Sequence, residues 1–399
     1  MLARLSEALM RMALTWGLAM LFLLAVAVQP LRFQSGDATE RQLDALFSQL
    51  AGPADPGSAV LVKYGGIKVL EKGYGVRELR THTKIDPRTN FRLASVTKQF
   101  TAMAVMLLIY DGKLHYDERL TDIFPEFPAY GKPITIRHLL THTSGLPDYE
   151  ELMERKEKTK GPIWSVEHQI EDAEVLSLLE HATAPKFAPG ASWAYSNSGY
   201  VVLGLIVAKA SGMPYRDFLE KRIFLPAGMN HSVVYQKGIN EVPERAFGHS
   251  KEGDKFTETD QSSTSATLGD GAIYSNLEDM SKWDDALENH SLLSETEMAT
   301  ALVPVKLADG SGPHWPNSSG EDNPDRGKPV SYGFGWFLNP WEGHPRMWHT
   351  GGTSGFRTVI ERFTANGLTV VILANRLEDR KSTRLNSSHQ SVSRMPSSA

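Results

Sequence analysis

Segments with the pattern of β-strands lie near both ends of the chain, and the segments between them are mostly helical in pattern. Near the start, residues 59–63 and 67–72 alternate around Gly65-Gly66, which is typical of a β-hairpin. Near the end, three more segments have strand character, namely residues 346–349, 356–363 and 368–375. A sheet that takes strands from both ends must be completed by segments far apart in the sequence. This order predicts an α+β fold.

Two of the intervening segments are apolar almost all the way round, so as helices they must be buried. Residues 95–110 form the first and stop at Asp111-Gly112, while residues 200–210 form the second and stop at Ser211-Gly212. A further helix is expected near residues 39–50. Three charged or polar segments, residues 150–160, 251–265 and 309–328, are expected to be solvent-facing loops.

The N-terminal segment has the pattern of a secretory signal. Arg4 and Arg11 precede an apolar run over residues 12–28, and residues 25–27 (Ala-Val-Ala) are small residues of the cleavage type. We therefore expect a signal peptide over residues 1–27 and a periplasmic or secreted catalytic body. The alternative is that the segment stays uncleaved and anchors the protein, which would be its only contact with a membrane.

The C-terminal segment has a different origin in our interpretation. From Asp379 the chain reads DRKSTRLNSSH, which is the translation of a common sequencing-library adaptor, and its ending SRMPSSA fits a distal part of that adaptor in the same frame. Residues 379–399 are therefore interpreted as adaptor read-through. Residues 28–378 show no Pro- or Gly-rich linker that would divide them, so they are expected to form one composite domain.

Composition excludes several classes of function. The 399 residues carry a formal net charge of -5, without the basic excess of a nucleic-acid-binding protein. Cysteine is absent, which excludes disulfides, a cysteine nucleophile and cysteine-based metal sites. The chain also lacks a P-loop, a dinucleotide-binding fingerprint and a Gly-x-Ser-x-Gly elbow. We expect no cofactor and no metal.

Ser95 and Lys98 open the first buried helix and lie three residues apart, on one helical face. A serine hydroxyl needs a base to become nucleophilic, and a lysine desolvated by such a helix can lose its proton near neutral pH. The helix start also offers amide donors to an oxyanion. A capping serine beside a solvated lysine would have the same spacing, so spacing alone leaves both interpretations open.

A second candidate motif is Tyr195-Ser196-Asn197, directly before the helix at residues 200–210. A phenol near a lysine can act in general acid–base catalysis, and an amide can orient a substrate carbonyl. The same tripeptide recurs at residues 274–276. There Asn276 precedes Leu-Glu-Asp, so helix capping explains it better.

The third candidate motif, His349-Thr350-Gly351-Gly352, lies at the end of a predicted strand, where glycine permits close backbone approach to a ligand. A different pair, His138 and His142, is four residues apart on a predicted helix. The metalloprotease pattern requires Glu after the first histidine, and this chain has Leu there, so structural histidines are favoured.

Together and in this order, these motifs resemble the serine β-lactamase and penicillin-binding-protein family. The likeness is to the branch with class C β-lactamases, D-Ala-D-Ala carboxypeptidases and related esterases, and it covers roughly residues 59–375. Three framework motifs reinforce it: HLLTHTSGL at 138–146, YSNSGY at 195–200 after Pro189-Gly190, and YGFGW at 332–336. The resemblance implies a β-lactamase/transpeptidase-like fold, with an antiparallel sheet flanked by helices and a mostly helical subregion. Its usual C-terminal helix is missing from this sequence.

The resemblance also implies a role for each motif residue. Ser95 would be the acylated nucleophile, Lys98 its proton acceptor and Tyr195 a partner in acid–base work. Among the substrate-binding residues, Asn197 would bind the substrate amide, and His349, Thr350 and Gly351 would line the side that receives a carboxylate. The oxyanion hole would be formed by the amides of Ser95 and Gly352.

The expected activity is that of an exported serine hydrolase that acts through an acyl-serine intermediate on an ester or a D-amino-acid amide. The substrate is a small molecule or resembles peptidoglycan. Many β-lactamases have lysine where this chain has His349, so the carboxypeptidase or esterase type is favoured over hydrolysis of β-lactams. The alternative is a non-catalytic penicillin-binding or cell-wall ligand-binding protein on the same fold.

Overall fold

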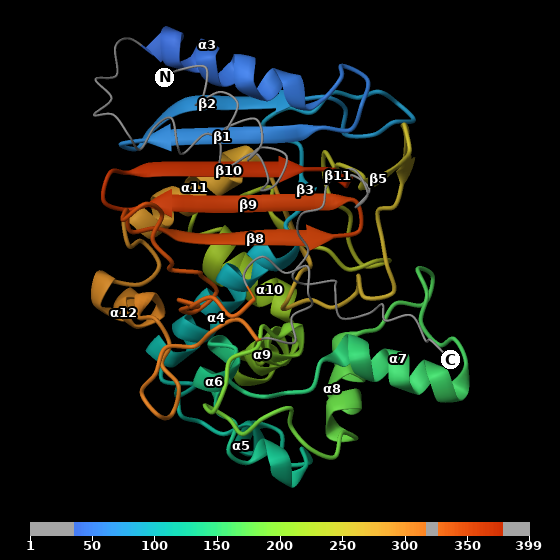
Figure 1. Cartoon of the computed structure of the whole chain (residues 1–399), viewed down its shortest axis with the longest axis vertical. Helices are drawn as coiled ribbons and strands as arrows, with labels where there is room; N and C mark the ends of the chain where they lie inside the picture. Colours follow the sequence, from blue (N-terminus) through green and yellow to red (C-terminus); the bar gives the residue numbers. More distant parts are fainter. Residues whose placement is uncertain (1–35, 317–325, 378–399) are drawn as a thin grey trace.

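The structure is a computed structural model that describes residues 36–316 and 326–377. The expected signal peptide over residues 1–27 and the expected read-through over residues 379–399 lie outside the described residues. Figure 1 shows a sheet in one half of the molecule and a group of helices in the other. Within the described residues, every helix is too short or too polar to cross a membrane.

The main sheet has five antiparallel strands in the order β2-β1-β10-β9-β8. Its strands are β1 (Ser58–Tyr64), β2 (Ile67–Tyr74), β8 (Met347–Thr353), β9 (Phe356–Phe363) and β10 (Leu368–Ala374). The predicted hairpin is β1–β2, and β10 pairs with β1 so that Val62 lies opposite Val370. The expected sheet built from distant segments is therefore confirmed, as is the antiparallel α+β architecture.

The helix predicted near residues 39–50 is α3 (Gly36–Phe47), which packs on one face of this sheet at its β2 side (Figure 1). Leu43 and Phe47 of α3 are buried in one cluster with Val60 of β1 and Val370 of β10. The described chain has no helix after β10, and it continues into β11 (Arg376–Leu377), which pairs in parallel with β5 (His249–Glu252). The N-terminal helix thus buries apolar side chains of a face that the resemblance would assign to a C-terminal helix.

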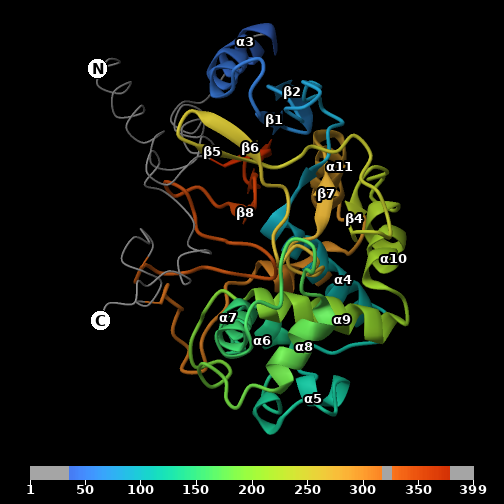
Figure 2. The same ribbon diagram turned by 90° about the vertical axis from the view of Figure 1, so that its right-hand side faces the viewer.

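The opposite face packs on α11 (Leu277–Glu288), and α3 and α11 lie on opposite sides of the sheet in Figure 2. A buried ion network joins this face to α11. Lys63 Nζ of β1 lies 2.7 Å from a carboxylate oxygen of Asp284, and Arg362 Nε of β9 lies 2.6 Å from the other. Thr369 of β10 donates to the same carboxylate at 2.7 Å. Three strands are therefore fixed to one side chain of α11.

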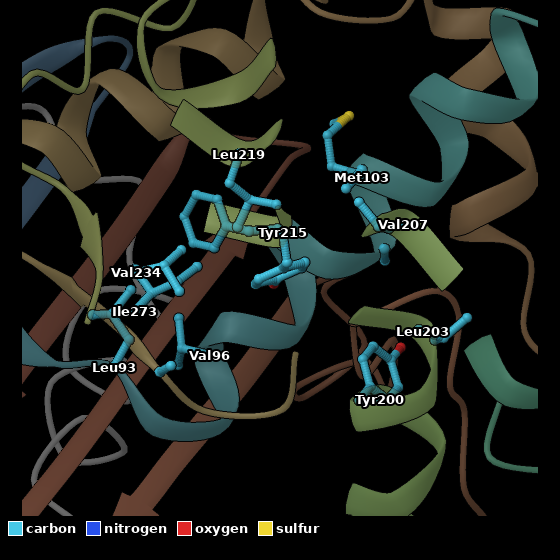
Figure 3. Packing of buried hydrophobic residues seen from close by; sticks show 14 of the residues in the cluster. Leu93, Val96, Met103, Tyr200, Leu203, Val207, Tyr215, Leu219, Val234 and Ile273 are labelled. Carbon is cyan, nitrogen blue, oxygen red and sulfur yellow. The ribbon is translucent and has the colours of Figure 1, made fainter. Parts of the chain in front are cut away.

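The helical half is built around two buried helices, α4 (Lys98–Tyr110) and α9 (Asn197–Ser211), which correspond to the two apolar segments of the sequence. They pack against each other and against α10 (Tyr215–Leu219). Figure 3 shows Met103 of α4, Val207 of α9 and Tyr215 of α10 among the packed side chains. This core holds the N-terminal ends of α4 and α9 in fixed positions, and Ser95, Lys98, Tyr195 and Asn197 lie at those ends.

Shorter elements complete the described chain. The helices are η1 (Ser48–Leu50), η2 (Ala94–Thr97), α5 (Leu120–Ile123), η3 (Ala129–Gly131), α6 (Ile136–Leu140), α7 (Tyr149–Lys160), α8 (Asp172–Glu180), η4 (Glu220–Phe224), α12 (Glu295–Ala299) and η5 (Thr300–Leu302). The remaining strands are β3 (Phe91–Arg92), β4 (Val233–Val234), β6 (Lys255–Glu258) and β7 (Ile273–Ser275). They form two small sheets, β11-β5-β6 and β3-β7-β4.

The prediction of a loop is wrong for two of the three polar segments, which contain regular structure. Residues 150–160 belong to α7, whose Asp148 cap accepts hydrogen bonds from the amides of Glu150 and Glu151 at 2.9 and 3.3 Å. Residues 251–265 include most of the β5–β6 hairpin (Figure 2). Both segments are polar on their exposed sides, so polarity concealed their regular structure. Residues 317–325 of the third expected loop lie outside the described residues.

Candidate active site

Ser95 lies in η2, a single tight turn that runs directly into α4. The preceding Ala94 has a φ of 49°, in the left-handed region that non-glycine residues rarely occupy. Such a conformation persists only where the surrounding structure holds it, and it is common at active sites. Ser95 is 9 % exposed, so its hydroxyl sits at the border between the core and the surface. The turn, rather than the α-helix itself, positions the predicted nucleophile.

Lys98, the first residue of α4, is completely buried beneath Ser95. Its ammonium nitrogen lies 3.0 Å from Ser95 Oγ, 2.9 Å from Asn197 Oδ1 and 3.0 Å from the main-chain oxygen of Asp270. The structure therefore brings Ser95, Lys98 and Asn197 together, from segments about 100 residues apart. A solvated lysine beside a capping serine, the other interpretation of this spacing, does not describe the geometry.

Burial lowers the pKa of Lys98 to about 8, because a charged ammonium loses its hydration in the interior. Asp270 and Glu150 oppose this effect and raise the pKa in part. A neutral amine has two N–H donors and one lone pair. Two of its three neighbours, Asn197 Oδ1 and the Asp270 oxygen, can only accept a hydrogen bond. The lone pair of neutral Lys98 therefore faces Ser95 Oγ, which is the orientation that removing a proton requires.

Tyr195 stands just before α9, and its Ser196 neighbour caps that helix by accepting from the Gly199 amide at 3.0 Å. The Lys98 nitrogen lies 5.0 Å from the centre of the Tyr195 ring. Burial raises the pKa of Tyr195 well above its usual value, and a hydrogen bond with the Ser95 hydroxyl acts in the opposite direction. Tyr195 is thus a protonated phenol in contact with the candidate nucleophile.

The second Tyr-Ser-Asn tripeptide lies elsewhere, as predicted. Asn276 caps α11 by accepting from the Asp279 amide at 2.9 Å. Tyr274 is buried in β7 and accepts a hydrogen bond from Arg245 at 3.1 Å. The capping interpretation of this tripeptide is confirmed.

The His-Thr-Gly-Gly motif occupies β8, the edge strand of the main sheet, which packs along η2. A side chain at Gly351 would place its Cβ 2.1 Å from the main-chain oxygen of Leu93, so only glycine fits there. Thr358 of β9 donates to that same oxygen at 2.7 Å and joins the sheet to the turn that carries Ser95. Gly352, the next residue, is exposed. An oxyanion hole formed by the Ser95 and Gly352 amides stays a prediction.

His349 is completely buried in β8. Its Nδ1 lies 2.6 Å from the Thr350 carbonyl oxygen, and its Nε2 lies 3.3 Å from the Tyr332 hydroxyl. Thr350 is half-buried. Direct contact between His349 and a substrate carboxylate stays a prediction, because both ring nitrogens have protein partners in this structure.

Two acidic residues near Lys98 were not singled out in the sequence. Asp270 is 7 % exposed, and its Oδ2 lies 3.5 Å from the hydroxyl of Tyr149. Burial, together with Asp148 and Asp270, raises the pKa of Glu150 to about 8. Asp270 contacts Lys98 through its main chain, so no side-chain motif marks this contact. Glu150 lies in the first turn of α7, within a charged segment that has the composition of a solvent-facing loop.

The two histidines at residues 138 and 142 do not share a helical face. α6 ends at Leu140, so only His138 lies on it, with its Nδ1 3.1 Å from Thr135 Oγ1. His142 lies two residues beyond the end of α6 and has a φ of 60°. In the described part of the chain, no three His, Cys, Asp or Glu side chains gather in a way that would hold a metal ion.

Comparisons with known proteins show the family of the chain. The Beta-lactamase family model matches residues 43–391. Penicillin-binding protein 4* of Bacillus subtilis is 32 % identical over 354 residues, which cover 85 % of this chain and 72 % of that protein. A D-aminopeptidase of Cereibacter sphaeroides is 28 % identical over 85 % of this chain and 60 % of its own length.

A solved structure shows the same fold. The crystal structure of a penicillin-binding protein from Bacillus halodurans superposes with a TM-score of 0.67 at 27 % identity, over 86 % of this chain and 96 % of that one. The family match covers most of the chain, including all three candidate motifs. The chain therefore belongs to the β-lactamase family, the serine hydrolase family that includes penicillin-binding proteins and D-aminopeptidases.

Proposed function

We propose that this chain is a hydrolase that forms an acyl-serine intermediate at Ser95. The observation that carries the proposal is the environment of Lys98, whose buried nitrogen contacts Ser95 Oγ and two fixed acceptors. An amine that is neutral near pH 8 and directs its lone pair at a serine hydroxyl is suited to remove that proton.

The reaction has two halves. Ser95 Oγ forms a bond to the substrate carbonyl carbon while its proton passes to Lys98, and the carbonyl electrons move onto oxygen. When that intermediate collapses, the bond to the leaving amine or alcohol breaks, and Tyr195 together with Lys98 returns the proton to the leaving group. Water then attacks the acyl carbon while the same groups accept its proton. The bond between that carbon and Ser95 Oγ breaks, the proton passes to Ser95 Oγ, and the carboxylic acid leaves.

We propose a D-amino-acid amide or a related ester as the substrate. The support is similarity to a D-aminopeptidase and the presence of His349 where many β-lactamases of this family have lysine. Asn197 is placed to orient the substrate amide, since its Oδ1 contacts Lys98 and its side chain is half-buried. Hydrolysis of β-lactams is expected to be slower than that of simple esters and amides.

The proposal is tested by covalent labelling followed by mapping of the labelled residue. A fluorophosphonate probe and a fluorescent penicillin should both label wild-type protein, and the fluorophosphonate should map to Ser95. A panel of a D-alanine and an L-alanine p-nitroanilide, a p-nitrophenyl ester and a chromogenic cephalosporin then ranks substrates. Labelling by the penicillin without turnover of any substrate would instead identify a non-catalytic penicillin-binding protein.

We further propose that the protein is exported, on the pattern of residues 1–27. The test is expression of the full chain in a bacterial host, with cell fractionation and N-terminal sequencing of the mature form. A mature N-terminus close to residue 28 in the periplasm or medium supports cleavage. An intact N-terminus in the membrane fraction supports the uncleaved anchor, and recovery in the cytoplasm contradicts export.

A further inference from the structure

His142 contacts the chain on both sides of Tyr195. Its carbonyl oxygen accepts the amide of Ala194, the residue before Tyr195, at 3.0 Å. Its ring Nδ1 accepts the amide of Ser196, the residue after Tyr195, also at 3.0 Å. Main chain and side chain of one residue therefore hold a peptide group just before Tyr195 and the peptide group directly after it.

The His142 ring also packs directly on the Tyr195 ring. The two ring centres are 4.4 Å apart and the planes are inclined by 34°. On its other sides the imidazole packs on Tyr332 and Tyr200, with ring centres 4.6 and 5.1 Å apart, so aromatic rings enclose it on three sides. His142 is 1 % exposed. An imidazole held this tightly transmits its own position to Tyr195.

Backbone geometry supports a specific role for His142. The residue has a φ of 60°, a conformation that costs free energy for any side chain except glycine and is tolerated best by Asn, Asp and His. Strain of this kind is kept where the surrounding structure needs it. Here the turn moves the ring off the end of α6, which stops at Leu140, and directs Nδ1 to the Ser196 amide.

The ring must also be in one tautomer. Because Nδ1 accepts a hydrogen bond from an amide, the proton of the neutral imidazole is on Nε2. Replacing the ring by one without a nitrogen would leave the buried Ser196 amide without this acceptor. A buried donor without a partner tends to move toward water or another acceptor, and this movement would carry Tyr195 away from Ser95.

From these contacts we infer that His142 is a positioning residue that holds Tyr195 in its catalytic location through the amides of Ala194 and Ser196. The inference rests on the proposed acyl-serine function, because it assigns His142 no chemistry of its own. The inference assigns different roles to the two histidines of the HLLTH segment, because His138 contacts Thr135 at the start of its own helix.

The test uses two complementary variants of the full chain. His142→Phe keeps an aromatic ring but removes the Nδ1 acceptor, and His142→Asn removes the ring but keeps an acceptor and tolerates a positive φ. Because a displacement of about 1 Å can cost about 100-fold in rate, we expect His142→Phe to lower kcat about 100-fold on a p-nitrophenyl ester with little change in KM. His142→Asn should recover to within about 10-fold of wild type. His138→Asn is the matched control and should keep the wild-type kcat.

A double-mutant cycle distinguishes positioning from a general structural effect. If His142 acts through Tyr195, adding His142→Phe to Tyr195→Phe should lower kcat by no more than about 3-fold further. A second loss of about 100-fold in the double variant would overturn the inference, as would a wild-type kcat for a folded His142→Phe. Circular dichroism melting of each variant confirms folding. Failure of wild-type protein to label at Ser95 would overturn the proposed function itself.

Discussion

Lys98 is fully buried, and its nitrogen forms hydrogen bonds with three polar partners. Burial favours the neutral amine, and the main-chain and amide oxygens hold it in one orientation. The same nitrogen would donate three hydrogen bonds as an ammonium ion, so a change of charge reverses only its contact with Ser95. In the proposed reaction, the charge state of Lys98 would therefore decide whether Ser95 can act as a nucleophile.

Acylation of Ser95 should consequently depend on pH. Since the neutral form is the active one and the pKa of Lys98 is lowered to about 8, the labelling rate should rise as pH increases and level off above this value. The measurement is the rate of fluorophosphonate labelling between about pH 6 and 10, corrected for probe hydrolysis. A rate that is constant over this range would contradict the assignment of Lys98 as the base.

Substitutions at the site should separate the nucleophile from its helpers. Ser95→Ala should abolish labelling, whereas Lys98→Ala and Tyr195→Phe should lower kcat by several powers of ten because the groups act as one unit. Tyr274→Phe is the matched control from the other Tyr-Ser-Asn tripeptide and should leave kcat unchanged. Ester hydrolysis by Ser95→Ala at a wild-type rate would contradict the site, and a Tyr274→Phe defect equal to that of Tyr195→Phe would show that the wrong tyrosine was chosen.

For single residues, short sequence motifs predict which side chains form the site, but they do not predict which main-chain groups contribute to it. Ser95, Lys98 and Asn197 were identified from short motifs, and they meet within hydrogen-bonding distance. The third partner of Lys98 is a carbonyl of Asp270, which any residue could supply, so no letter of the sequence marks it. The positive φ that takes His142 out of its helix depends likewise on contacts with a segment 50 residues away.

Among the elements, α3 has a stabilising role that can be measured. Phe47 is completely buried against the sheet, so Phe47→Ala should lower the free energy of unfolding by about 3–5 kcal/mol. Chemical denaturation followed by circular dichroism measures the change. Gln42→Ala on the exposed side of the helix is the control and should change stability by less than about 0.5 kcal/mol. Because α3 packs on β2 at one edge of the sheet and the turn of Ser95 packs on β8 at the other edge, kcat of the folded Phe47→Ala protein should be unchanged. A full loss of activity would contradict this separation.

Regular elements were predicted where one side is strongly apolar and missed where it is not. The α4 and α9 segments are apolar throughout and were identified, and the β1–β2 hairpin followed from alternation around two glycines. α7 buries only Tyr149 and Met153, so its charged sequence resembles a loop. Its ends did carry a signal, because Asp148 and the acidic first turn are typical of a helix start and two lysines of a helix end.

For the molecule as a whole, Asp284 is the carboxylate of α11 that Lys63 and Arg362 share. Asp284→Asn would leave Lys63 with Asp285 and Arg362 with Glu288, two carboxylates that are more than half exposed, so we expect a loss of about 1–3 kcal/mol at pH 7. Burial alone would raise the pKa of Asp284, but Arg362 and Lys63 outweigh it, so the net pKa lies below 3.8. A carboxyl whose pKa is lower in the folded protein stabilises the fold fully when the pH is above its pKa in the unfolded chain. This stabilisation is lost as the pH falls through its pKa in the folded protein.

The difference in stability between wild type and Asp284→Asn should therefore be full at pH 7 and shrink below about pH 4. Chemical denaturation of wild type and Asp284→Asn at pH 7 and at about pH 3 measures the two differences. Asp285→Asn is the control, since that side chain is 51 % exposed and bonds only one member of the network, Lys63. A difference that persists unchanged to pH 2 would contradict the ionic origin of the effect.

The pairing of β1 with β10 also governs when a growing chain can complete its main sheet. Ser58 lies opposite Ala374, so β1 cannot pair on this side until a strand 316 residues further along the chain has been made. Contacts of such long sequence separation form slowly, and until β10 emerges one edge of β1 has unpaired amide and carbonyl groups. A nascent chain that stops after Tyr195 would therefore contain Ser95, Lys98 and Tyr195 but would leave that strand edge exposed. The later strands β8, β9 and β10 complete the sheet, and β8 also supplies the strand that packs along η2, the turn of Ser95.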